Sequence, residues 1–225
     1  MPPIGKQYGF RARWRRNFSR PAALQEVNKP VDSTADPDVQ LMLAVQRGQH
    51  SAFQELFQKH LAGVVRFAAQ FVGDKARAEE LAQDVFLQIF RTRARYVPSA
   101  RFRTWLYRMV ANACLSEMRR TEYRGRTRSL DQSPVAGGKT ISAVDSPTRS
   151  SEEVALDREA VEKMRAILGE LPAQQRAALL LARVEGLSYE EVAASLSCSV
   201  SAVKSLVHRA TVTLRDRMRY EGERE

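Results

Sequence analysis

Cysteine and histidine are scarce in this sequence, and their scarcity excludes several kinds of site. The chain has 225 residues but only two cysteines, Cys114 and Cys198, too far apart for the close pair of a zinc knuckle or a redox couple. The three histidines show no metal-ligand spacing with cysteine or carboxylate. We therefore expect reduced thiols, no metal site and no cofactor.

Long apolar runs are also missing. No run approaches the roughly 18 residues that span a bilayer, and the basic start of the chain lacks the apolar stretch of a secretory signal. No segment alternates between polar and apolar residues as a half-buried strand does. We therefore expect an all-α protein that works in the cytoplasm and contains no sheet.

Basic residues are in excess, and their distribution is uneven. The formal net charge is +10 and the pI is about 10, which favours an anionic partner, nucleic acid first and an acidic membrane surface second. Residues 91–128 hold eleven arginines and only two acidic residues, whereas residues 37–90 are nearly neutral. Interleaved with these arginines are Tyr96, Phe102, Trp105, Tyr107 and Tyr123. Arginines neutralise phosphates and aromatic faces stack on unpaired bases, so the segment suits opened nucleic acid; a solvated basic helix is the alternative.

Composition divides the chain into four zones. Residues 1–36 are basic, contain several prolines and are expected to be mostly disordered. Residues 37–120 and 157–220 have helical periodicity and predict two small helical bundles. Residues 121–156 are rich in Gly, Pro, Ser and Thr, which predicts a flexible linker between the bundles.

The first bundle is expected to contain four helices, over about 38–47, 51–72, 76–94 and 102–120. Ser51 is the expected cap of the second helix. In the third helix, apolar residues recur at helical spacing from Ala78 to Phe90, and acidic and amide side chains occupy the opposite face. The loop 95–101, which contains Pro98, separates the third helix from the fourth.

The second bundle is expected to contain a helix-turn-helix. Helices are predicted over 157–171 and 172–185, with Pro172 in the first turn of the latter. Ser188 and Glu191 form a capping box at the start of the next helix. A short turn over 197–199 then leads into a last helix over 200–220. Such a pair places its second helix in the major groove of DNA; an ordinary helical hairpin is the alternative.

Three stretches carry a resemblance to one protein family. They are AEELAQDVFLQIFR (78–91), FRTWLYRMVANACLSEMRR (102–120) and LPAQQRAALLLARVEGLSYEEVAASLSCSVSAVKSLVHRA (171–210). In this order they resemble the polymerase-docking helix, the promoter-melting helix and the minus-35 reader of bacterial sigma factors, in the extracytoplasmic-function (ECF) group of the sigma-70 superfamily. The resemblance implies sigma region 2 in 37–120, sigma region 4 in 157–220, and a protein that is not itself an enzyme.

The resemblance also implies the partners. Core RNA polymerase would bind through a coiled coil of its largest subunit and the flap of another, promoter DNA would bind both bundles, and an anti-sigma factor, which could hold the protein at the membrane, is expected. No stable homo-oligomer is expected. The implied polymerase-binding residues are Glu79, Glu80, Gln83, Asp84, Gln88 and Arg91. A plain solvated face is the alternative for this set.

The implied DNA-binding residues form two sets, and no catalytic residue is expected. The minus-10 set is Arg95, Tyr96, Ser99, Arg101, Arg103, Tyr107, Arg108, Asn112, Arg119 and Arg120. Within it, the loop 95–101 matches the base-capturing loop, and Tyr96 and Tyr107 are the expected stacking residues, whereas Trp105 is expected in the core. The minus-35 set, in a helix-turn-helix over about 188–209, is Ser199, Ser201, Lys204, Ser205, His208 and Arg209.

The sequence departs from the family pattern at four positions. Glycine is usual at Ser197, threonine at Ala202 and arginine at Leu206, so the preferred minus-35 sequence is open. The family frequently has an acidic residue at the position of Ser116, so the local salt bridge of such a residue is not expected in this chain.

Two rival interpretations stay open at this point. The first is a conventional helix-turn-helix regulator that acts without polymerase, although it leaves the arginine-rich and aromatic helix unexplained. The second is a metal-dependent nucleic-acid-processing protein with Glu79, Glu80 and Asp84 as ligands, although a second carboxylate cluster is missing.

Overall fold

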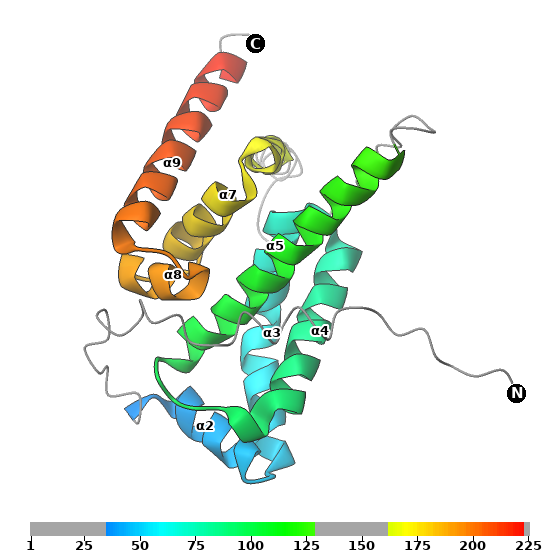
Figure 1. Cartoon of the computed structure of the whole chain (residues 1–225), viewed down its shortest axis with the longest axis vertical. Coiled ribbons are helices and arrows are strands. Elements are labelled where there is room, and N and C mark those ends of the chain that lie inside the picture. The colour runs from blue at the N-terminus through cyan, green and yellow to red at the C-terminus, as the bar shows by residue number, and fades with distance from the viewer. Residues whose placement is uncertain (1–34, 129–161, 223–225) are drawn as a thin grey trace, which may run out of the picture. The chain divides into compact units, whose positions relative to one another are not determined.

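A computed structural model describes residues 35–128 and 162–222, in which every regular element is helical (Figure 1). The expectation of an all-α protein is therefore confirmed for the described residues. Most of the predicted basic tail and most of the predicted linker lie outside the described residues.

The first bundle consists of the four predicted helices. They are α2 (Pro37–Gln46), α3 (His50–Val72), α4 (Lys75–Thr92) and α5 (Phe102–Arg128), and α3 packs against the other three (Figure 1). The largest fully buried side chains of this core include Phe67, Phe71 and Phe102. Each contributes about 1.5–3 kcal/mol by leaving water, so the apolar stripes that the sequence shows hold the helices together.

Short polar side chains and a glycine set the helix ends in this bundle. The Asp36 carboxylate accepts a hydrogen bond from the Asp38 N–H at 3.0 Å and caps α2. In the same way, Asp74 accepts from the Arg77 N–H at 2.7 Å and caps α4. Gly73 ends α3 with a left-handed φ of 77°, a conformation that glycine adopts without strain.

Two predicted helix boundaries in the first bundle are wrong. Ser51 does not cap α3, because the helix already begins at His50 and Gln49 occupies the capping position without a side-chain bond. At the other end of the bundle, α5 continues to Arg128, into the segment predicted as linker. Arginine is a good helix former and a single glycine costs only about 1 kcal/mol, so polar composition alone did not end this helix.

The second bundle contains the predicted helix-turn-helix. The described residues 162–170 are helical, α7 (Ala173–Leu179) continues into a π-helical turn (Leu180–Val184), and α8 (Tyr189–Leu196) precedes α9 (Val200–Gly222). The capping box of α8 is confirmed: Glu191 N–H donates to Ser188 Oγ at 3.2 Å, and Ser188 N–H donates to the Glu191 carboxylate at 2.9 Å.

A buried arginine collects carbonyl groups at helix ends. Arg176 is only 4 % exposed, and its guanidinium donates to the carbonyls of Phe71, Gly169 and Leu171. Two of these carbonyls lie in the last turns of α3 and of the helix that contains 162–170, where the helix dipole is negative. Burial lowers the pKa of Arg176. The helix ends thus compensate a buried cation without a carboxylate.

The left-handed residue Ser197 gives a first testable prediction. Ser197 follows α8 with φ 55° and is the one described residue other than glycine with a positive φ. Because a side chain is strained in this conformation, Ser197→Gly is expected to raise the free energy of unfolding by about 0.5–1 kcal/mol in urea titrations. The matched control Ser201→Gly, in the first turn of α9, should lower it. A loss of stability in Ser197→Gly would show that the strain is absent.

Candidate nucleic-acid and partner interfaces

Helix α4 separates an apolar face from an acidic one. Ala78, Leu81, Ala82, Val85, Phe86 and Ile89 are buried. Glu79, Glu80, Gln83, Asp84 and Arg91 are exposed, and Gln88 is half-buried. The predicted amphipathic pattern is therefore confirmed. The polar side chains of this set, called the α4 acidic face below, are placed where a basic partner can reach them.

An exposed leucine, which is not among the predicted residues, interrupts the α4 acidic face. Leu87 is 49 % exposed. Its spacing from Glu80, Asp84 and Arg91 puts it on the same side of the helix. The signal was available, because Leu87 falls outside the apolar stripe of α4. An exposed apolar side chain within a charged rim is the usual composition of a protein-binding surface.

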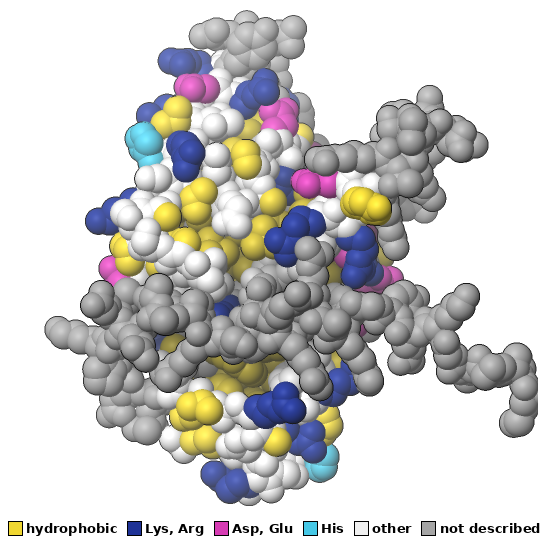
Figure 2. Space-filling view, viewed as in Figure 1, with side chains coloured by type: hydrophobic (Ala, Val, Ile, Leu, Met, Phe, Trp, Pro, Cys, Tyr) yellow, Lys and Arg dark blue, Asp and Glu magenta, His cyan; other side chains and the backbone are white. Residues whose placement is uncertain are grey.

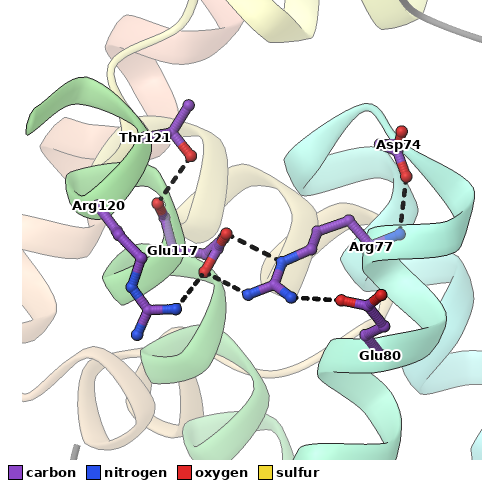
Figure 3. Close-up of polar contacts among 6 residues, drawn as sticks. All are labelled: Asp74, Arg77, Glu80, Glu117, Arg120 and Thr121. Carbon is purple, nitrogen blue, oxygen red and sulfur yellow. Dashed lines mark hydrogen bonds and ion pairs between the residues drawn. The ribbon is translucent and has the colours of Figure 1, made fainter. Parts of the chain in front are cut away.

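A network of charged side chains joins α4 to α5 (Figure 3). Arg77 of α4 donates through Nε and Nη2 to the two carboxylate oxygens of Glu117 of α5, at 2.9 and 2.7 Å. Arg77 also pairs with Glu80, and Arg120 pairs with Glu117 at 3.3 Å. The hydrogen bond to Glu117 is the main cause that raises the pKa of Arg77. Ser116 stands where the family pattern frequently has an acidic residue, but the neighbouring Glu117 makes a local ion pair.

The two cysteines of the chain are free thiols in different surroundings. Cys114 is buried in α5, and burial, reinforced by the charge of Glu117, raises its pKa to about 12. Cys198 is half-buried, and burial raises its pKa as well. Neither thiol is activated as a nucleophile.

The loop before α5 exposes polar side chains but buries its aromatic one. Arg95, Ser99 and Arg101 are exposed and therefore accessible to a partner. Tyr96 is only 6 % exposed and packs edge-on against Trp105, with ring centroids 4.9 Å apart. Burial also raises the pKa of Tyr96. In this conformation Tyr96 cannot stack on a base, contrary to the expectation from the sequence, because it closes the apolar end of the bundle.

Tyr107, the second residue expected to stack on a base, is also buried, at 3 % exposure. This expectation from the sequence is therefore wrong. Its ring packs against Phe67 of α3 at 5.6 Å between centroids. A Cβ at Gly63 would lie 3.0 Å from the Tyr107 hydroxyl, so the glycine permits the close approach. The helical period of α5 allowed both a buried and an exposed placement, and the neighbouring helix decided between them. Tyr123, at 74 % exposure, is the accessible aromatic residue of α5.

Two of the predicted DNA contacts on α5 are bonded to the second bundle. Arg103 Nη2 donates to the buried Glu185 carboxylate at 3.0 Å, and Arg108 Nη2 lies 3.5 Å from Ser197 Oγ. Thr104 beside them donates to Glu191 at 2.8 Å. The remaining members of the set lie along the same helix. Asn112 is half-buried, Arg119 is exposed and bonded to Ser116, and Arg120 takes part in the Glu117 pair.

The predicted reading face of α9 is fully exposed. Ser199, Ser201, Lys204, Ser205, His208 and Arg209 are all exposed. Val203 and Val207 are buried and Val200 is half-buried, so the predicted packing of the valines is confirmed. Ser199 Oγ accepts from the Ala202 N–H at 3.2 Å and caps the helix, as predicted. Side chains of α9 therefore divide into a packing face and a polar face suited to a DNA groove.

More basic than acidic side chains appear on the face shown in Figure 2, among scattered apolar ones. Within residues 35–128 and 162–222, no three His, Cys, Asp or Glu residues are grouped to hold a metal ion. In the same part of the chain, no helix is long and apolar enough to cross a membrane.

Two family models match the two bundles. The model described as Sigma-70 region 2 matches residues 56–124, and the model described as Sigma-70, region 4 matches residues 162–214. These matches fall on the α3 to α5 segment and on the segment that contains the helix-turn-helix.

Several curated proteins are similar over most of the chain. The RNA polymerase sigma-H factor of Pseudomonas aeruginosa is 32 % identical over 185 residues, which cover 79 % of this chain and 91 % of the relative. The sigma factor CarQ of Myxococcus xanthus is 32 % identical, over 75 % of this chain and 90 % of the relative. The ECF sigma factor SigE of Mycolicibacterium smegmatis is 34 % identical over 73 % of this chain, which spans 61 % of the relative's length.

Solved structures agree in fold. CnrH in complex with the cytosolic domain of CnrY has a TM-score of 0.60 at 24 % identity and covers 82 % of this chain and 99 % of that chain. The sigma factor RpoE in complex with the anti-sigma factor NepR from Bartonella quintana has a TM-score of 0.58 at 23 % identity, over 74 % of this chain and 96 % of that chain. Together with the two region matches, these relatives show that the chain belongs to the ECF group of the sigma-70 family, the polymerase subunits that direct promoter-specific transcription initiation.

Proposed function

We propose a division of labour among three surfaces of this sigma factor. The α4 acidic face, with Leu87 at its centre, binds core RNA polymerase. The loop 95–101 and the basic side of α5 hold the opened minus-10 element. The polar face of α9 reads the minus-35 element as duplex. Polymerase supplies the chemistry, and the sigma factor contributes binding and positioning in the cytoplasm.

One observation carries this proposal: the three polar surfaces lie on elements whose other sides are packed. In α9, for example, Lys204, His208 and Arg209 are exposed while Val203 and Val207 are buried. A helix held in this way presents its polar side chains at fixed spacing, as groove recognition requires. The conventional regulator uses only α9 and explains neither the α4 acidic face nor the exposed arginines of the loop.

Binding of an opened strand to the start of α5 would compete with contacts that α5 makes to the second bundle. Arg103 and Thr104 are bonded to Glu185 and Glu191 in this structure. A phosphate that binds Arg103 would compete with the buried Glu185 carboxylate for the Nη2 donor, because both are anions and Nη2 already donates to Glu185 at 3.0 Å. We infer that minus-10 binding includes release of these contacts.

An anti-sigma factor is the proposed regulator. A protein that covers the α4 acidic face would compete with polymerase for it. RpoE of Bartonella quintana is bound to the anti-sigma factor NepR in its solved structure. Any attachment of this sigma factor to a membrane would then come from that partner.

Run-off transcription tests the proposed function. Full-length protein added to core polymerase should give a discrete transcript from a cognate promoter, which is found by mapping transcript starts after overexpression. Lys204→Ala with Arg209→Ala should lower the transcript yield at limiting protein about 30-fold or more, because each lost contact costs about 1–3 kcal/mol and the two costs add.

The controls separate this proposal from its rival. Thr213→Ala, a half-buried position of α9 outside the reading set, should leave the yield unchanged. Equal loss on a pre-melted fragment that lacks the minus-35 element would contradict the assignment of α9. Duplex binding without any polymerase-dependent transcript would favour the conventional regulator.

A further inference from the structure

The loop that displays the proposed minus-10 residues is short and exposed. It follows a 3-10 turn (Arg93–Arg95) and ends at the first residue of α5. Val97 at its tip is 71 % exposed, and Ser99 and Arg101 are exposed beside it. A loop that distinguishes one base from another must keep a fixed shape, because a mobile loop adapts to each base. Residues that fix the shape of this loop would therefore influence which base it binds.

One side chain of α2 holds the first end of this loop. Gln46 Nε2 donates to the carbonyl of Ala94 at 3.1 Å and to that of Tyr96 at 3.2 Å. The side-chain amide has two N–H groups, and the two loop carbonyls use both of them. These carbonyls lie at the end of the 3-10 turn, where helical partners are missing. Gln46 thus fixes the backbone on both sides of Arg95.

A carboxylate at the other end of α2 holds the second end of the loop. Asp36 Oδ2 accepts from the Phe102 N–H at 2.9 Å, while its Oδ1 caps α2 through the Asp38 N–H at 3.0 Å. One side chain therefore caps two helices. Asp38 in turn binds Lys59 at 2.6 Å and His60 at 2.9 Å, which anchors α2 to α3. The support beneath the loop is rigid on this side as well.

Between these two anchors the loop makes contacts of its own. Ser99 N–H donates to the Val97 carbonyl at 2.9 Å, and the Tyr96 ring packs on Trp105. The Tyr96 hydroxyl is buried and makes no hydrogen bond to the described residues. We propose that Gln46 and Asp36 are positioning residues for minus-10 base discrimination: they hold both ends of the loop 95–101 without contacting DNA themselves. This inference rests on the proposed function of the loop.

The test measures base discrimination by the complete holoenzyme. Core polymerase with full-length protein transcribes a panel of promoters that differ by one base at each minus-10 position. Gln46→Met keeps the side-chain length but removes both donors, and it is expected to lower the ratio of best to next-best base about tenfold. Binding to polymerase and to a minus-35 duplex should stay unchanged. Gln54→Met, at an exposed position of α3, is the matched control and should keep the wild-type ratio.

The second anchor provides an independent arm and a rescue. Asp36→Ala removes both acceptors and should also reduce discrimination, whereas Asp36→Asn keeps one acceptor for Phe102 N–H and should restore most of it. Thermal melting gives the folded fraction of each variant. The discrimination ratios of Asp36→Ala and Asp36→Asn are then compared at equal folded fractions, so that unfolding does not contribute to the difference. Wild-type discrimination in folded Gln46→Met and Asp36→Ala would overturn the inference. A wild-type protein that gives no transcript would instead contradict the proposed function.

Discussion

Asp84→Arg is expected to weaken binding to core RNA polymerase by about tenfold or more. The substitution replaces an exposed carboxylate in the middle of the α4 acidic face with a cation. If the partner surface is basic, attraction becomes repulsion at that point, and charge reversal at an interface lowers the association rate and raises the dissociation rate. Fluorescence anisotropy of labelled protein titrated with core enzyme measures the change directly.

The experiment needs a control for net charge. Glu55→Arg, at an exposed position of α3, changes the charge of the protein by the same amount and should bind polymerase like the wild type. Duplex binding through α9 should be similar in both variants. Co-elution of Asp84→Arg with core enzyme at wild-type affinity, or equal weakening in both variants, would contradict the assignment of the α4 acidic face. Leu87→Ala tests the apolar centre of the same face in the same titration.

Breaking the Arg77–Glu117 pair should destabilise the first bundle. Glu117→Leu is expected to lower the free energy of unfolding by about 2–3 kcal/mol. Breaking a fully buried ion pair costs more, but the Arg77 side chain is 32 % exposed, and Glu80 remains as a second partner. The loss comes from Arg77, which would keep only its pair with Glu80.

A double-mutant cycle isolates this interaction. Arg77→Met combined with Glu117→Leu removes both charges and should lie within about 1 kcal/mol of the wild type, well short of the sum of the two single losses. Urea unfolding followed by circular dichroism supplies the four free energies. Glu122→Leu, at an exposed position further along α5, is the control and should change little. Additive effects in the cycle would show that the contact contributes no net stability.

Some of the candidate site could be predicted because its signals are local. The apolar period of α4 separated buried Val85 and Phe86 from exposed Asp84 before any partner helix was known. The Ser188–Glu191 capping box and the burial of Val203 follow from spacings of three or four residues. The buried side of a helix can be predicted from its own sequence, since residues three and four apart share a face.

The predictions that were wrong depended on more than the local sequence. Tyr96 and Tyr107 were expected on the DNA side, but contacts with Trp105 and Phe67 bury them. Ser51 was expected to cap a helix that begins one residue earlier. The linker was expected from residue 121, but α5 continues through Arg128. In each case a neighbouring element, or the persistence of a helix already formed, outweighed the local preference.

The sequence by itself determined two helical bundles, the amphipathic sides of α4 and α9, and the family. Tertiary structure decided which side chains meet across the chain: Glu117 with Arg77, Arg103 with Glu185, and Gln46 with the loop carbonyls of Ala94 and Tyr96. Periodicity reports that a side is buried or exposed, but the identity of the partner depends on packing between segments far apart in the chain. For that reason the positioning residues of the loop became visible only in the folded protein.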